Sequence, residues 1–176
     1  ISWANLTWNV FGGAALGILP AVLREHLGLD ELTASAAFVA GMVVVVLLTL
    51  PVTRGVQRKL GPFPAFLAAS AVQGAALLLF VPPAMAVLAP LLVAAFLLSN
   101  STAAASLNGA RALEVGHEQQ ALLNILVMTI GMIGFIAGLV LAAILLGLTG
   151  FGLVLALTGL GMAATATLFR RPPVAA

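Results

Sequence analysis

Apolar runs of roughly 20 residues fill most of this 176-residue chain, and only short polar gaps separate them. Hydrophobic residues make up 62% of the sequence and charged residues 7%, whereas soluble globular domains carry about 25% charged residues. So few charges cannot cover a surface that faces water. In lipid every backbone polar group needs an internal partner, which leaves helices or closed barrels. The runs do not alternate polar with apolar residues, so the sequence predicts an all-α, polytopic transmembrane helical bundle.

Six transmembrane helices are predicted from these runs. Their expected bounds are residues 3–23, 32–51, 63–81, 84–107, 121–146 and 151–169. The chain divides near Pro82 into two groups of three, which is compatible with an inverted three-plus-three repeat. The sequence begins with Ile1 rather than Met, so we expect a fragment, or one half of a 12-helix protein.

Residues that favour helix ends lie at the borders of these runs. Gly28 suits the end of the first helix, Asp30 the start of the second, and Pro62 the first turn of the third. Residues 147–150 predict a tight turn before the last helix. Trp8 lies toward the start of the first run and is expected, like other aromatic side chains near span ends, to anchor at the membrane interface.

Lysine and arginine residues gather on one side of this layout. That side holds Arg54, Arg58, Lys59, Arg111, Arg170 and Arg171, whereas the other side holds only Arg24. The first three lie in a predicted basic loop, and Arg111 opens a polar gap that extends to Gln120. Because Lys and Arg are enriched on the cytoplasmic side of membrane proteins, we expect both termini in the cytoplasm. The predicted location is the plasma or inner membrane.

The composition disfavours several classes of function. The chain has no cysteine, which excludes disulfides, thiolate metal sites and cysteine nucleophiles. Its two histidines, His26 and His117, fall in polar gaps, so neither can activate a serine at membrane depth. No Asp, Glu, Lys, Arg or His lies deep within a predicted span, which argues against a proton relay. No basic stripe suits nucleic acid. We therefore expect no enzyme activity, no cofactor and no metal site.

Uncharged polar residues remain as candidates inside the spans. Asn5 and Asn9 share one helix face, Asn100 lies near mid-depth of the fourth span, and Asn124 lies one turn into the fifth. Gln73 is central in the third span. Ser99, Thr102 and Ser106 share one face of the fourth span. Such side chains either form hydrogen bonds between helices, worth about 0.6 kcal/mol each, or contact a ligand.

Glycines form a second pattern. Gly13 and Gly17 are four residues apart in the first span, and Gly131, Gly134 and Gly138 follow one another in the fifth. Small residues at this spacing let helix backbones approach closely. They predict either ordinary packing contacts or surfaces that slide when the bundle rocks.

The chain resembles the C-terminal six-helix half of a major facilitator superfamily transporter. Three segments carry the resemblance, namely residues 17–20 leading into 27–29, residues 54–61, and residues 116–120 before the glycine-spaced fifth span. The second segment, Arg-Gly-Val-Gln-Arg-Lys-Leu-Gly, is similar to the family's basic loop motif Gly-x-x-x-Asp-Arg-x-Gly-Arg-Arg. It departs from that motif because Arg58 stands at the acidic position and Arg54 at the first glycine.

The resemblance implies a binding site at mid-membrane between two six-helix halves. In the family, the first, second, fourth and fifth helices of this half contribute to the site, which points to Asn5, Asn9, Asn100 and Asn124 as substrate-binding residues. The third helix usually lies outside the cavity, so Gln73 ranks lower.

Two functions follow from this reading. The first is a secondary transporter half that moves a small neutral or amphipathic solute by alternating access, with the lipid bilayer and a second six-helix half as partners. The alternative is a non-transporting membrane subunit that scaffolds or orients a partner protein. Water-accessible positions near Asn9 would favour the first function.

Overall fold

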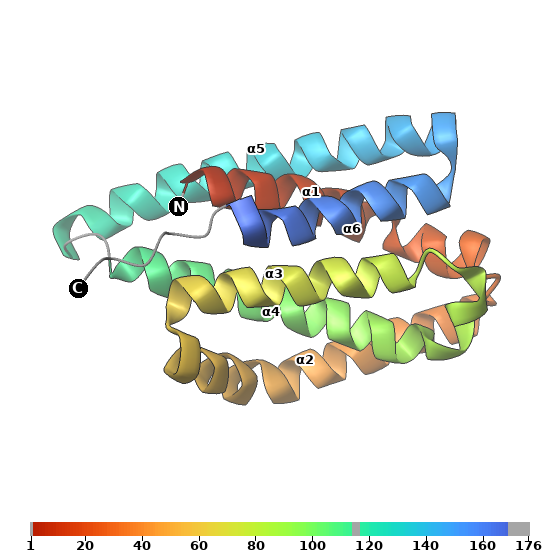
Figure 1. The fold of residues 1–176 in the computed structure, drawn as a ribbon, viewed down its shortest axis with the longest axis horizontal. Coiled ribbons are helices and arrows are strands. Elements are labelled where there is room, and N and C mark those ends of the chain that lie inside the picture. Colours follow the sequence, from red (N-terminus) through yellow and green to blue (C-terminus); the bar gives the residue numbers. More distant parts are fainter. Residues whose placement is uncertain (1, 114–116, 169–176) are drawn as a thin grey trace.

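The computed structural model describes residues 2–113 and 117–168, and this part of the chain is helical and contains no strand. Figure 1 shows the helices packed side by side. They are α1 (Ser2–Ala21), α2 (Glu31–Leu60), α3 (Pro62–Leu79), α4 (Ala89–Ala112), α5 (His117–Thr149) and α6 (Phe151–Leu168). A π-helical turn, Val22–His26, extends α1, and a 3₁₀ turn, Pro83–Leu88, precedes α4. The predicted all-α fold class is confirmed.

Five stretches of the described residues are long and apolar enough to cross a membrane. They are Trp3–His26, Glu31–Leu60, Pro62–Leu79, Pro83–Ala112 and Gln120–Thr149. The sixth predicted span corresponds to a shorter apolar helix, Phe151–Thr167. The outer surface is also apolar: Val46 and Leu47 of α2 and Ile125 and Met128 of α5 are all exposed. A bundle that is apolar both inside and outside is suited to lipid, so these helices indicate a membrane protein.

The helices pack in a definite set of pairs. α1 packs against α5, α2 against α4, and α3 against both α4 and α6, with a smaller contact between α1 and α6. In Figure 1, α1, α5 and α6 form one group and α2, α3 and α4 the other, and α3 and α6 join the two groups. The largest fully buried side chains include Phe66, Phe96 and Leu155. They belong to the core cluster that connects the two groups.

The predicted basic loop at Arg54, Arg58 and Lys59 is wrong, because these residues lie in the last turns of α2. The helix continues through Pro51 to Leu60. Proline removes one backbone donor but is tolerated in membrane helices whose neighbours stabilise them. Here α4 supplies that support. The Thr53 hydroxyl donates to Thr102 Oγ1 at 3.3 Å, and Gln57 Nε2 donates to Ser106 Oγ at 3.2 Å. The predicted span 32–51 is therefore nine residues too short at its end.

The connection between α1 and α2 matches the predicted end signals. Gly28 has φ of 69°, in the left-handed region that glycine adopts most easily. Asp30 caps α2, since its carboxylate accepts from the Thr33 backbone nitrogen at 2.9 Å and from the Thr33 hydroxyl at 2.6 Å. These two bonds lower the pKa of Asp30 below its usual value, because they favour the ionised carboxylate. α2 begins at Glu31 and α3 at Pro62, each within one residue of the expected start.

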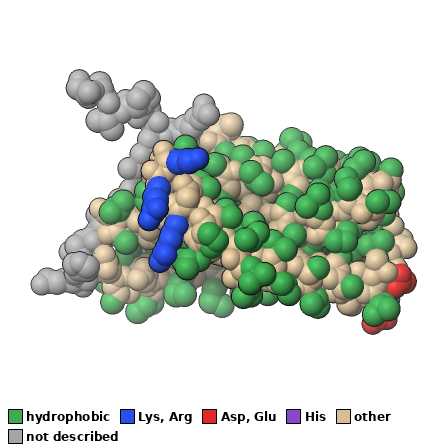
Figure 2. Space-filling view, turned by 90° about the horizontal axis from the view of Figure 1, so that it is seen from below, with side chains coloured by type: hydrophobic (Ala, Val, Ile, Leu, Met, Phe, Trp, Pro, Cys, Tyr) green, Lys and Arg blue, Asp and Glu red, His purple; other side chains and the backbone are tan. Residues whose placement is uncertain are grey.

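Charged side chains separate along the length of α2. Its first turn carries Glu31 and its last turn carries Arg58 and Lys59. Figure 2 shows basic side chains at one end of the face that it displays and acidic side chains at the other, with hydrophobic side chains between them. α1 begins and α6 ends at the same end of the bundle as the α2–α3 turn (Figure 1). The basic residues of α2 therefore lie at the same end of the bundle as the first residues of α1 and the last residues of α6.

Candidate functional site

A buried chain of hydrogen bonds links α1, α3 and α4 near the middle of the bundle. The Trp8 indole nitrogen donates to Gln73 Oε1 at 3.0 Å, and Gln73 Nε2 donates to Asn100 Oδ1 at 2.9 Å. Gln73 is fully buried. Trp8 is also buried, and its ring meets Phe66 edge-on with centroids 6.0 Å apart. The expectation that Trp8 anchors at the membrane interface is therefore wrong, because its polar atom binds inside the bundle.

Asn5 and Asn9 form a second polar group on α1, facing α5. The Asn5 side-chain nitrogen donates to the Val127 carbonyl of α5 at 3.2 Å. Asn9 Nδ2 donates to the Asn5 carbonyl at 2.8 Å and to Asn5 Oδ1 at 2.9 Å. Asn5 is buried and Asn9 is half-buried. Asn5 thus joins two helices, and Asn9 extends this group toward open space.

That open space is a groove between α1, α4 and α5, with a volume of ≈ 410 Å³. We call it the α1–α4–α5 groove. Its lining residues are Asn5, Trp8, Asn9, Ala104, Leu107, Asn108, Arg111, Val127, Met128, Gly131, Met132, Phe135 and Ile136. The polar side chains gather near one end, and Met132, Phe135 and Ile136 continue an apolar wall along α5. The groove can therefore accommodate a molecule with one polar end and an apolar body.

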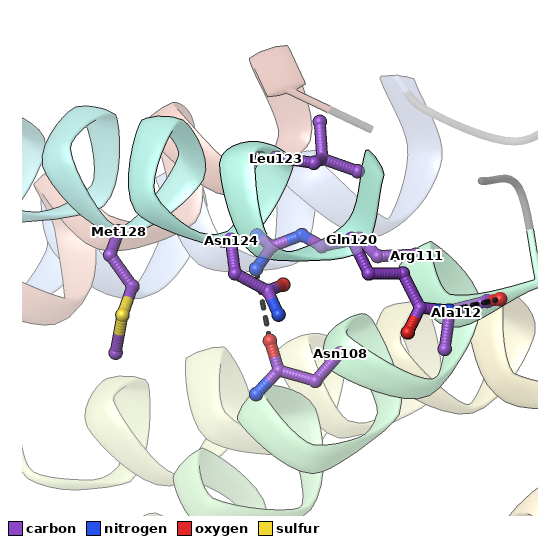
Figure 3. A pocket seen from close by; sticks show the side chains of 7 residues that line it. All are labelled: Asn108, Arg111, Ala112, Gln120, Leu123, Asn124 and Met128. Atoms are coloured by element: carbon purple, nitrogen blue, oxygen red, sulfur yellow. Dashed lines mark hydrogen bonds between the residues drawn. The ribbon is translucent and has the colours of Figure 1, made fainter. Parts of the chain in front are cut away.

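A second pocket of ≈ 280 Å³ adjoins this groove and shares Asn108, Arg111 and Met128 with it. We call it the arginine pocket. Figure 3 shows its seven lining side chains, contributed by the end of α4 and the start of α5. Besides the three shared residues they are Ala112, Gln120, Leu123 and Asn124. Because three residues line both spaces, the groove and the arginine pocket lie next to each other.

Arg111 is the charged residue at the junction of the two spaces, and sequence reasoning placed it just beyond the fourth helix. It lies in the last turn of α4 and is buried, with 7% of its surface exposed. Its Nη1 donates to Asn108 Oδ1 at 2.9 Å, whereas Nε and Nη2 have no hydrogen-bond partner in the described part of the chain. The spacing of three between Asn108 and Arg111 is the signal that could have placed both on one helix face.

The predicted substrate-binding asparagines do not all lie in one place. Asn5 and Asn9 line the α1–α4–α5 groove, and Asn124 lines the arginine pocket. Asn100 lines neither space, because its side chain turns toward Gln73. Gln73, which ranked lower, is the centre of the buried hydrogen-bond chain. A residue's position along its own helix does not tell which neighbouring helix its side chain will face.

The serine and threonine face of α4 packs against α2 and within its own helix. Thr102 and Ser106 accept the hydrogen bonds from α2 described above, and the Ser99 hydroxyl donates to the Phe96 carbonyl at 2.9 Å. None of the three lines the α1–α4–α5 groove. Their geometry fits the first of the two roles considered for such side chains, namely hydrogen bonds that hold helices in place.

The spaced glycines lie where α1 and α5 meet. A Cβ atom added to Gly138 would lie 2.9 Å from the Ala14 nitrogen and against the Val10 carbonyl, so the two backbones touch there. A Cβ at Gly13 would contact the backbone of Phe135. The other three glycines face side chains or backbone across the same boundary: Gly17 faces Leu139, Gly131 faces Asn9, and Gly134 faces Leu6. This packing brings α5 close enough to α1 to close one wall of the groove.

The described residues contain no group of three or more His, Asp or Glu side chains that could hold a metal ion. The chain also matches no protein-family model, no curated protein and no solved structure. Its resemblance to the major facilitator superfamily therefore stays a prediction that rests on the sequence segments and the helix layout.

Proposed function

We propose that this chain is one half of a secondary transporter of the plasma or inner membrane, which moves a small solute by alternating access. The observation that carries the proposal is the α1–α4–α5 groove, in which amide and guanidinium side chains line an otherwise apolar membrane bundle. Polar groups in lipid are costly, so a polar groove is favourable only where water, solute or protein covers it. A second six-helix half facing the groove would enclose the solute between the two bundles.

The pairing of the helices supports an inverted three-plus-three repeat. If α1 is exchanged with α4, α2 with α5 and α3 with α6, the α1–α5 contact becomes the α4–α2 contact. The α3–α6 contact maps onto itself, and the α3–α4 contact becomes the α6–α1 contact. α1 and α4 run in opposite directions (Figure 1), as an inverted repeat requires. The same helix pairs are therefore in contact before and after this exchange, as expected if a pseudo-twofold axis relates α1–α3 to α4–α6.

A reciprocal contact between Gly74 and Gly159 supports the same relation. A Cβ atom on Gly74 would meet the Gly159 carbonyl oxygen, and a Cβ on Gly159 would lie 2.9 Å from the Gly74 carbonyl oxygen. This mutual contact places the backbones of α3 and α6 directly against each other at the boundary between the two groups. The α3–α6 boundary is thus the natural position for a pseudo-twofold axis of the bundle.

The proposed orientation places both termini in the cytoplasm. The start of α1, the end of α6 and the last turn of α2, with Arg58 and Lys59, lie at one end of the bundle. Asp30 and Glu31 lie at the other end. Basic residues near the ends of membrane spans favour the cytoplasmic side. The arginine pocket would then open toward the cytoplasm.

Single cysteines provide the test, because the chain contains none of its own. We expect Asn9→Cys, in the groove, to react with a membrane-impermeant maleimide both in intact cells and in inside-out vesicles, since alternating access exposes the groove to each side in turn. Leu160→Cys on α6 is the matched control. Leu160 is 57% exposed on the bundle and is not among the residues that line the α1–α4–α5 groove, so lipid should protect it. Labelling of Asn9→Cys from one side only would contradict alternating access.

The alternative, a scaffold that orients a partner protein, is favoured by the exposed apolar faces of α2 and α5. The same experiment separates the two functions. A docked partner would protect Asn9→Cys in native membranes from both sides, and the cysteine would become reactive only after the chain is purified alone.

A further inference from the structure

Arg111 lines the arginine pocket, and one edge of its guanidinium group is buried without a partner in the described part of the chain. Nη1 is held by Asn108, and the two nitrogens left without hydrogen bonds among the described residues are Nε and Nη2. These two lie on the same edge of the planar group, and their N–H bonds point in parallel. This is the edge with which arginine binds a carboxylate or phosphate through two hydrogen bonds.

Leaving this edge empty is costly for the folded chain. Arg111 is more than nine-tenths buried, and a buried donor without an acceptor loses its bonds to water without replacement. The cost is larger for a charged group. An anion that enters the pocket would satisfy both nitrogens and neutralise the charge at once.

The surroundings of Arg111 suit an anion. Among the described residues, the other polar side chains that line the arginine pocket are the amides of Asn108, Gln120 and Asn124, and none of the described lining residues is Asp or Glu (Figure 3). Gln120 donates to the Ala112 carbonyl at 3.4 Å, which places its amide beside the pocket.

The space beyond the guanidinium is apolar. From Met128 the α1–α4–α5 groove continues past Met132 to Phe135 and Ile136 on α5, with Leu107 on the α4 side. A ligand that reaches Arg111 with its charged head can therefore bury an apolar body along this wall. Burial of such a body contributes about 25 cal/mol for each Å² removed from water.

We propose that Arg111 binds the oxyanion head, a carboxylate or phosphate, of an amphipathic anion whose apolar body lies in the α1–α4–α5 groove. This proposal rests on the proposed transport function, because it names the chemical class of the solute that the transporter would move. Two sources offer this chemistry: a soluble amphipathic solute from the cytoplasm, or an anionic phospholipid from the surrounding bilayer.

Binding of octyl phosphate to the purified chain in phosphatidylcholine nanodiscs tests the site. Trp8 lines the groove and serves as the fluorescent reporter in a Trp3→Phe background, since the chain has two tryptophans. We expect a saturable change in its emission. Inorganic phosphate, which lacks the tail, should bind more weakly, and octanol, which lacks the charge, should give no Arg111-dependent response.

Variants at Arg111 make the test specific. Arg111→Gln should weaken octyl phosphate binding at least about tenfold, and Arg111→Lys should lie between, because lysine keeps the charge but lacks the two-pronged edge. Arg58→Gln is the matched control, since it removes an exposed cation at the same end of the bundle and should leave the affinity unchanged. Circular dichroism and size-exclusion profiles check that each variant is folded.

Nanodiscs that contain phosphatidylglycerol distinguish the two sources. If the lipid is the ligand, Trp8 emission shifts without octyl phosphate, and this shift is lost in Arg111→Gln. If a soluble solute is the ligand, the lipid has no effect and octyl phosphate binds as before.

Either Arg111-dependent result supports the site. The proposal would be overturned if wild type and Arg111→Gln bound octyl phosphate with equal affinity. It would also be overturned if neither octyl phosphate nor phosphatidylglycerol gave a saturable response. The labelling of Asn9→Cys is a separate measurement. An anion site at Arg111 can therefore be supported when alternating access is contradicted, and alternating access can be supported when the anion site is not.

Discussion

A single methyl group at Gly138 is expected to force α1 and α5 apart. In Gly138→Ala the new carbon would lie against the Val10 carbonyl and within 2.9 Å of the Ala14 nitrogen, both of which are backbone atoms of α1. A backbone cannot rotate away as a side chain can, so the two helices must separate. Overpacking of this kind costs about 1–3 kcal/mol. We expect the free energy of unfolding, measured by dodecyl sulfate titration and circular dichroism, to fall by about 2–3 kcal/mol.

Gly147→Ala in the same helix is the matched control. A Cβ built at Gly147 has no atom within 4 Å apart from its own stretch of helix, so its methyl group meets open space. Alanine favours a helix over glycine by up to about 1 kcal/mol, so this variant should be as stable as the wild type or slightly more stable. Equal effects of Gly138→Ala and Gly147→Ala would mean that close contact between α1 and α5 does not contribute to stability.

Replacing Gln73 by methionine should have the second large effect. The change keeps the length of the side chain but removes both of its hydrogen bonds, which leaves the Trp8 indole nitrogen and Asn100 Oδ1 without their partners. Each unsatisfied buried group costs about 1–3 kcal/mol. We expect Gln73→Met to lower the free energy of unfolding by about 2–4 kcal/mol and to shift Trp8 fluorescence, because the indole loses its acceptor.

Two further variants show whether this cost comes from the hydrogen-bond chain. Trp8→Phe removes the indole donor, so Gln73→Met should cost less in that background than in the wild type. Gln57→Met breaks one half-buried bond to Ser106 and should cost only about 0.6 kcal/mol. If Gln73→Met is as mild as Gln57→Met, the buried chain does not hold α1, α3 and α4 together.

Local signals in the sequence predicted the helices well. Runs of apolar residues identified all six, and Asp30, Gly28 and Pro62 gave the starts of α2 and α3 to within a residue or two. The clearest error was at Pro51, which ended the predicted second span although α2 continues to Leu60. Proline disfavours a helix locally, but the bonds from Thr53 and Gln57 to α4 stabilise the turns that follow. That stabilisation comes from a residue pair 49 positions apart, which no local pattern contains.

The candidate site was only partly predictable for a similar reason. The asparagines were recognised as uncommon residues in apolar helices, and Asn5, Asn9 and Asn124 do line the groove or the arginine pocket. The importance of Gln73 and Arg111 was missed. Both depend on how far α4 extends and how it is rotated, since Gln73 binds Asn100 of α4 and Arg111 lies in its last turn.

Composition and periodicity were enough to predict an apolar, all-helical chain suited to a membrane, because lipid permits few other ways to satisfy a backbone. They also predicted which glycines let helices approach. Which helices meet depended on packing, since α1 pairs with α5 across more than a hundred residues. Packing also buried Arg111 beside an open pocket. The cost of the guanidinium edge that has no partner among the described residues arises only once the surrounding helices have excluded water, so this feature belongs to the folded bundle and not to any segment of the chain.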